Sequence, residues 1–414
     1  MLRLIDGWDV VFGNDQVQLK YPQSYITFIQ QGGIAAPAGP SGSAAPHDKG
    51  IFLFNTAFGE ANFQRTFDSQ PTWVYQTDFQ MAGVGSGAPY PVMEWCRFLQ
   101  GPKPSGVKLC SLTTTSTGQM TVKFFDGSPS ENVVVTFTTT AVLTANTWAN
   151  LKFKITLGPV SAFTLQFNGS TVLNQVGISL GGLYPQADTV CVMRWQGFGP
   201  PGVALDNTVI WDTQNNGDGF TDLMPPQRIT TVIANADVAG GNWGPFLAAA
   251  SLSSDAVNPT RFNTPMSDYD YATPNNVNAL QLFLMETVPC YGQINALALN
   301  FALKAIPPVS TLPSITAVVR ELTAPNSMGV LQALNLFPSN IASLVRGYWI
   351  LQAIAPLSLQ TGTGWKAGNL SNDAFGMIAD PSNIAERVSA VSLEVLTDVS
   401  GLPFTCGGLS NYSY

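Results

Sequence analysis

The sequence predicts an all-β protein with two antiparallel β-sandwich (jelly-roll) domains in tandem. Three observations predict this class. Helical periodicity is scarce, and short β-branched or aromatic runs are broken repeatedly by Gly, Pro, Asn and Ser. The length of 414 residues exceeds the roughly 250 to 300 residues at which a single hydrophobic core stops growing. We place the first sandwich at residues 1–215 and the second at residues 220–414.

The clearest strand pattern of the first domain lies between residues 150 and 169. Leu151, Phe153 and Ile155 alternate with two lysines, which predicts a strand with one apolar face and one face in solvent. Farther along, Asn168 and Gly169 separate two apolar runs, and both residue types adopt positive φ at low cost. This region therefore predicts antiparallel strands joined by a two-residue hairpin.

The second domain shows looser strand spacing. Strands are predicted at residues 278–285, 294–303, 314–320 and 388–396, with loops rich in Pro and Asn between them. At the junction, residues 205–212 are predicted as the last strand of the first domain, and a polar turn follows them. The chain is thus expected to pass directly from one sandwich to the next.

Charge and hydropathy exclude several classes of partner. The chain carries 18 Lys and Arg against 26 Asp and Glu, which gives a net charge of −8 and a pI near 4.6. This balance opposes binding to nucleic acid or to an anionic membrane surface. No run approaches the roughly 18 consecutive apolar residues of a membrane span, so membrane insertion is not expected.

The first ten residues and the cysteines bear on the compartment. The start of the chain has one basic residue and no long apolar core, so we expect no secretory signal. We expect the protein to be assembled in a cytoplasm. The five cysteines form no CxxC pair and are odd in number. They predict neither a disulfide framework nor a zinc site.

The sequence offers few candidate catalytic residues. A glycosidase of this fold class needs two or three carboxylates on one strand face, and no Glu begins such a motif. Glu94, which precedes a Trp, is the nearest candidate, but a structural or interface carboxylate is the favoured interpretation. The single histidine, His47, falls in a segment rich in Gly and Pro, a poor place to hold a catalytic base. We therefore expect no enzymatic activity.

The polar turn at the junction offers hard oxygen ligands of the kind that Ca²⁺ prefers. The candidate ligands are Asp212, Asn216, Asp218 and Asp222. The stretch lacks the complete spacing of a calcium-binding loop, and side chains that bond to backbone amides of a turn are the favoured alternative. No cofactor is expected, and Ca²⁺ is the one metal that the sequence suggests.

Aromatic residues supply the remaining candidate sites. Trp73, Trp95 and Trp195 could stack on sugar rings, although Trp is also a common core residue of sandwiches. Tyr269 and Tyr271 could anchor a subunit interface because Tyr brings a large contact area at low entropy cost.

Short segments along the chain resemble a known family. In the first domain these are residues 2–9, 148–153, 163–169 and 205–212, which resemble the concanavalin A-like (laminin-G-like) jelly roll of tailed-bacteriophage virion proteins. In the second domain they are residues 234–237, Trp243, 268–271, 363–367 and 389–395. The sequence departs from the family pattern at residues 30–50 and 89–104.

The resemblance implies a structural, non-enzymatic protein of the phage virion. Such a protein would sit in the head decoration, the collar or the tail or fibre assembly, and would work through stable contacts with identical subunits and with capsid, portal or tail proteins. The alternative is a glycan-binding receptor module that attaches the particle to the bacterial surface. The sequence leaves both functions open.

Overall fold

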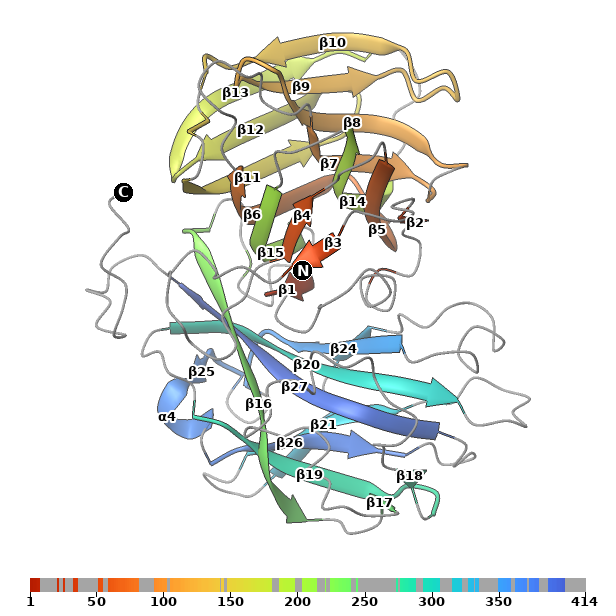
Figure 1. Cartoon of the computed structure of the whole chain (residues 1–414), viewed down its shortest axis with the longest axis vertical. Coiled ribbons are helices and arrows are strands. Elements are labelled where there is room, and N and C mark those ends of the chain that lie inside the picture. Colours follow the sequence, from red (N-terminus) through yellow and green to blue (C-terminus); the bar gives the residue numbers. More distant parts are fainter. Residues whose placement is uncertain are drawn as a thin grey trace. The chain divides into compact units, whose positions relative to one another are not determined.

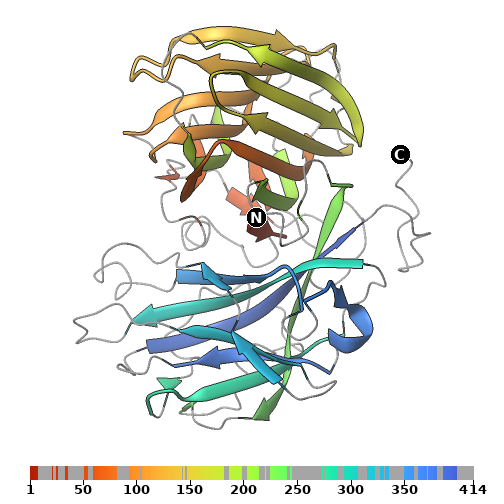
Figure 2. The same cartoon turned by 180° about the vertical axis from the view of Figure 1, so that it is seen from behind.

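The fold is known from a computed structural model of the whole chain (Figure 1; Figure 2 from behind). The structure describes residues 1–7, 21, 25–26, 33–35, 51–54, 59–81, 93–102, 105–141, 143–144, 147–180, 186–197, 203–213, 220, 224–239, 243–244, 273–274, 276–287, 293–305, 315–321, 327–330, 332–334, 349–358, 362–370, 372–379 and 386–398. The chain divides into two compact units, and among the described residues the boundary falls between Pro226 and Gln227.

The first unit contains two antiparallel sheets. The strands of the eight-stranded sheet are, in spatial order, β13 (Ser170–Ile178), β12 (Ser161–Phe167), β11 (Trp148–Thr156), β6 (Thr72–Met81), β15 (Val203–Asp212), β4 (Ile51–Phe54) and β3 (Gly33–Ala35), with β1 (Leu2–Asp6) also on β15. The strands of the seven-stranded sheet are β10 (Val133–Thr138), β9 (Met120–Phe125), β8 (Val107–Thr114), β7 (Met93–Gln100), β14 (Ala187–Gly197), β5 (Gly59–Gln70) and β2 (Tyr25–Ile26).

The core of the first unit lies between these two sheets. Aromatic pairs join strands of opposite sheets: Phe98 to Phe153 with ring centroids 6.0 Å apart, and Phe124 to Phe163 at 5.9 Å. The predicted alternation on β11 is confirmed on its apolar side, because Leu151, Phe153 and Ile155 are fully buried. The predicted hairpin is also confirmed, since Asn168 and Gly169 both have positive φ.

Lys152 differs from its prediction as a solvent-facing residue. It is buried, and its ammonium donates a hydrogen bond to the carbonyl oxygen of Met224. On the same side of the sheet, the ring of Phe220 packs edge-on against Trp211. Residues that follow β15 therefore cover this outer face, a long-range contact that strand periodicity does not reveal.

The second unit is built around one continuous path of antiparallel strands, with two further short strands, β17 (Trp243–Gly244) and β18 (Thr273–Pro274), paired with each other. The path is β22 (Ser327–Val330), β21 (Thr316–Glu321), β26 (Ala374–Ile378), β19 (Leu280–Met285), β16 (Gln227–Ala239), β27 (Glu386–Asp398), β20 (Gln293–Ala305), β24 (Trp349–Ala355) and β23 (Gln332–Leu334), with β25 (Trp365–Lys366) on β20. Strand β16 pairs with β27 through residues 227–233 and with β19 through residues 234–239. It thereby joins two halves of the path.

These two halves enclose one apolar core. Phe283 and Phe375 come from one half, Leu299 and Phe301 from the other, and all four belong to a single buried cluster. The helix α4 (Ala367–Leu370) follows β25 and adds Leu370 to this cluster. The predicted all-β class with sandwich architecture is thus confirmed. Within the described ranges, no helix is long and apolar enough to cross a membrane.

Candidate functional site

The outer face of the seven-stranded sheet carries a cluster of polar and charged side chains. Val190 and Phe98 are partners across β14 and β7, and Phe98 points into the core. Side chains alternate along a strand, so the next pair, Cys191 and Arg97, points to the outer face. This alternation places Arg97 near the middle of that face.

Three neighbours hold the Arg97 guanidinium. Its Nη2 donates to Oδ1 of Asn62 on β5 at 2.9 Å and contacts Sγ of Cys191 at 3.5 Å. The Cys191 thiol also donates to the same Asn62 oxygen, at 2.9 Å. On its other side, Arg97 Nε lies 3.5 Å from Oε2 of Glu94, which is three residues earlier on β7. The guanidinium is fixed between β5 and β7 and is 3% exposed.

Lys108 on β8 extends this arrangement toward the edge of the sheet. Its ammonium lies 2.9 Å from Oε1 of Glu94 and 3.6 Å from Oε2 of Glu131. The same nitrogen is 4.8 Å from the centroid of the Phe125 ring, a cation–π geometry. Two carboxylates separated by 37 positions in the sequence therefore share one cation.

A tight turn between β9 and β10 brings Glu131 to this place. Asp126 begins the turn and accepts hydrogen bonds from the Asn132 amide at 2.7 Å and from the Ser128 hydroxyl and backbone N–H at 2.7 and 3.0 Å. These bonds lower the pKa of Asp126 to about 2. Glu131 has φ of 50°, a left-handed conformation that is uncommon for residues other than Gly, Asn and Asp. Such conformations persist where the surroundings hold them, as the Asp126 turn does here.

Two buried polar groups beside Arg97 have no hydrogen-bond partner in the described part of the chain. One is the Nδ2 amide of Asn62, and the other is the hydroxyl of Ser111, which is the register partner of Arg97 on β8. Buried polar atoms are nearly always paired in native proteins, and an unpaired one costs about 1 to 3 kcal/mol. We call this set the Arg97 cluster: Asn62, Glu94, Arg97, Lys108, Ser111 and Glu131.

The Arg97 cluster leads from the protein interior to solvent. Asn62 is fully buried, whereas the side chains of Glu94, Lys108 and Glu131 are 10%, 12% and 23% exposed. Its two cations and two carboxylates balance in charge. Carboxylates accept hydroxyl hydrogens, and an ammonium and an amide donate to oxygen. Such a set suits a neutral ligand rich in hydroxyl groups.

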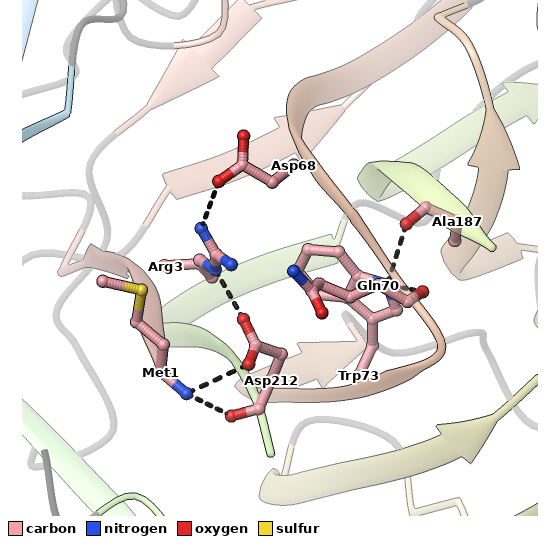
Figure 3. A network of polar contacts seen from close by, with 7 residues as sticks. All are labelled: Met1, Arg3, Asp68, Gln70, Trp73, Ala187 and Asp212. Atoms are coloured by element: carbon pink, nitrogen blue, oxygen red, sulfur yellow. Dashed lines mark hydrogen bonds and ion pairs between the residues drawn. The ribbon is translucent and has the colours of Figure 1, made fainter. Parts of the chain in front are cut away.

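The Trp residues proposed for sugar stacking are corrected by the structure. Trp73 and Trp95 are fully buried between the sheets. The Trp73 indole donates to the carbonyls of Gln70 and Ala187, at 3.1 and 3.2 Å (Figure 3), and Trp95 donates to the Thr114 hydroxyl. A stacking platform needs an exposed ring face, so these two residues serve the core. The backbone of Trp195 lies in β14, and its side chain lies outside what the structure describes.

Asp212, proposed as a calcium ligand, is the last residue of β15 and is fully buried. Its Oδ2 accepts from Arg3 Nε at 2.5 Å, and its Oδ1 lies 3.2 Å from the Met1 amino group (Figure 3). Arg3 also reaches Asp68, at 3.2 Å. Both carboxylate oxygens of Asp212 are thus engaged by cations, which removes them as metal ligands.

The other predicted site residues fall outside the described residues. These are Asn216, Asp218 and Asp222 of the metal proposal and Tyr269 and Tyr271 of the interface proposal. Among the residues that the structure does describe, no group of three or more His, Cys, Asp or Glu side chains is arranged to hold a metal ion.

A second polar cluster lies on the outer face of the eight-stranded sheet. Asp78 on β6 accepts from the amides of Asn150 at 2.7 Å and Asn207 at 2.8 Å. Asn207 has φ of 49° and lies where the pairing of β15 with β6 shifts register. Both amide donors are buried with the carboxylate, so these hydrogen bonds connect β6 to its two neighbours, β11 and β15.

Of the Arg97 cluster, sequence reasoning found only Glu94. Asn62, Ser111 and Glu131 belong to no motif, and they meet because β8, β7, β14 and β5 follow one another in the sheet through pairings that are mostly distant in sequence. The signal that could have indicated Glu131 is the Asp126-Gly-Ser-Pro-Ser sequence before it, which is typical of a turn.

No family model and no curated protein matches the chain. Similar solved structures include an endo-β-1,4-glucuronan lyase from Trichoderma reesei, with 11% identity, TM-score 0.34 and coverage of 46% of this chain and 90% of that one. The Emp46p carbohydrate recognition domain has 8% identity and TM-score 0.29, with coverage of 47% and 91%. Sheep galectin-11 has 10% identity and TM-score 0.26, with coverage of 36% and 97%.

These findings correct the expectation of a non-enzymatic protein. Similar structures include an endo-β-1,4-glucuronan lyase. The missing glycosidase motif gives no ground for excluding catalysis, because the structure places a second carboxylate, that of Glu131, on the cation that Glu94 contacts. The virion role now depends on the sequence resemblance alone.

Proposed function

We propose that the first unit recognises a neutral glycan at the Arg97 cluster. The observation that carries this proposal is the pair of buried, unpartnered groups, Asn62 Nδ2 and the Ser111 hydroxyl, beside a fixed guanidinium. A site built for a polar ligand leaves such groups to be paired by that ligand, whereas a purely structural cluster pairs them internally.

The charge pattern supports a neutral ligand over a polyanion. Each cation of the Arg97 cluster already contacts a carboxylate, and the chain as a whole carries a net charge of −8. A polyanionic sugar would therefore meet long-range repulsion without an uncommitted cation to offset it. A carboxylate oxygen that already contacts a cation can also accept a hydrogen bond from a sugar hydroxyl, and Glu94 and Glu131 supply such oxygens.

The test is a glycan array with the full chain and its Ser111→Ala variant. Removing one hydrogen bond to a bound sugar should weaken the affinity about five- to tenfold. The same substitution removes an unpartnered hydroxyl from a buried position, so the variant should be as stable as the parent protein or more so. A structural role of Ser111 predicts the opposite pair of results: lower stability and unchanged glycan binding.

A matched pair of lysine variants locates the site on the array. Lys108→Met removes the ammonium shared by Glu94 and Glu131 and should abolish the glycan signal. Lys366→Met removes an exposed lysine of the second unit and should leave the signal unchanged. Glycans that bind should also be examined for cleavage products, since the site holds two carboxylates.

The second candidate function is a structural component of a tailed-phage virion, in the head decoration, collar or tail, assembled in the host cytoplasm. The resemblance of short segments across both domains supports it. Immuno-electron microscopy with an antibody against the chain should label tailed particles at one defined position. Particles that carry no label would exclude this role and leave glycan recognition untouched.

A further inference from the structure

Among the described strands, each sheet of the first unit ends in an edge strand at the same end of the sandwich. Strands β10 and β13 are the terminal strands of the seven- and eight-stranded sheets (both at the top of the first unit in Figure 1). Phe137 on β10 and Phe163 on β12, the neighbour of β13, have ring centroids 5.3 Å apart. The two edges therefore lie on the same side of the core.

Exposed valines lie on these edge strands and next to them. Val133 and Val134 begin β10, Val160 precedes β12, and Val176 lies on β13, with exposed fractions of 48%, 43%, 66% and 75%. The pairing of Phe163 with Gln175 and of Ser161 with Ile178 brings the last two valines together. We call these four residues the valine corner.

The valine corner and its edges carry no charge. The sequence has no charged residue from 132 to 151 and none from 155 to 187. Natural edge strands are usually protected by Lys, Pro or a bulge. Here β10 has a register shift at Val134, and no described strand pairs with its outer side from Val135 to Thr138.

We propose that the valine corner is the contact surface for a second copy of this chain. The net charge of −8 makes two copies repel over most of their surfaces, and an uncharged apolar corner is where they can meet without bringing carboxylates together. A two-fold contact brings the same patch of both copies together, and a patch without charges is complementary to itself. The open backbone of β10 adds hydrogen bonds across the contact.

The test is sedimentation velocity of the full chain across a dilution series. The parent protein should show a concentration-dependent monomer–dimer equilibrium. The double variant V134K/V176K places two like charges in each copy at solvent-exposed positions, so the fold tolerates it while the apparent Kd of the dimer rises tenfold or more. Val277→Lys, at an exposed position of the second unit, should leave the equilibrium unchanged.

A parent protein that stays monomeric at every concentration would overturn the proposal. So would a V134K/V176K variant that forms dimers as readily as the parent, or a Val277→Lys variant that disrupts them equally. The glycan array distinguishes this inference from the proposed function, because a monomeric variant keeps its Arg97 cluster and should still bind glycan.

Discussion

Glu131 lies 3.6 Å from the ammonium nitrogen of Lys108, and a left-handed backbone conformation places it there. Glu94, which precedes Lys108 in the sequence, contacts the same nitrogen at 2.9 Å. The cation thus joins strands β7 and β8 to the turn after β9. Whether this junction serves stability, ligand binding or both can be separated by experiment.

Lys108→Met should lower the free energy of unfolding of the first unit by about 2 kcal/mol. The substitution leaves two partly buried carboxylates close together without their shared cation. Chemical denaturation followed by Trp fluorescence measures the change, with Lys366→Met as the control. A loss equal to that of the control would show that the ammonium contributes nothing to the fold.

The Asp126 turn should resist acid to an unusually low pH. Hydrogen bonds from Asn132 and Ser128 depress the folded-state pKa to about 2 from an ordinary value of 3.8. A depressed pKa stabilises the turn fully above the ordinary value, and this contribution is lost as the pH falls from about 4 to about 2. Carboxyl NMR, with Asp126→Asn to assign the signal, should give a midpoint near 2. A midpoint near 3.8 would contradict the hydrogen-bonded turn.

Two substitutions at Asn207 should separate its hydrogen bond from its backbone conformation. Asn207→Gly removes the amide that donates to Asp78 but accepts a positive φ, and should cost about 2 kcal/mol. Asn207→Ala loses the same bond and strains the backbone, so it should cost about 1 kcal/mol more. Equal losses in thermal or chemical unfolding would show that the left-handed conformation carries no strain.

In the second unit, Glu394 should be sensitive to truncation. Its Oε2 accepts from the amides of Asn300 at 3.0 Å and Gln352 at 2.9 Å, and all three side chains are buried. Glu394→Ala leaves both amides without this acceptor and should cost about 2 to 4 kcal/mol. Glu394→Gln keeps one carbonyl oxygen and should cost less. The opposite order of stability would contradict the network.

Trp73→Ala and Trp95→Ala should each destabilise the first unit by about 3 to 5 kcal/mol, as expected for large residues removed from a packed core. Calorimetry of the full chain measures this loss. A variant that unfolds like the parent protein but loses glycan binding would restore the stacking role that burial argues against.

Sequence periodicity predicted much of the fold because it reports which side of a strand is buried. The strand predicted at residues 388–396 corresponds to β27, and Leu151, Phe153 and Ile155 point inward as expected. Lys152 shows the limit of this reasoning. Its ammonium bonds to Met224, and Phe220 packs on Trp211 of the same face, so residues from beyond β15 return to the sheet.

The candidate site was largely beyond prediction for a related reason. Arg97 meets Asn62 because β14 places β7 and β5 on its two sides, and the order of strands in a sheet is not encoded in local patterns. The Trp residues attracted a functional interpretation because sequence cannot distinguish a ring in the core from one on the surface. The turn sequence that begins at Asp126 is a local signal that could have indicated Glu131.

Hydrogen–deuterium exchange of the full chain, with and without an oligosaccharide selected on the array, tests glycan recognition at the Arg97 cluster most directly. We predict slower exchange at residues 94–97, 107–111 and 126–132 when the sugar is bound, and no such change in Lys108→Met. Protection confined to other segments, or unchanged exchange with every sugar tested, would contradict the account.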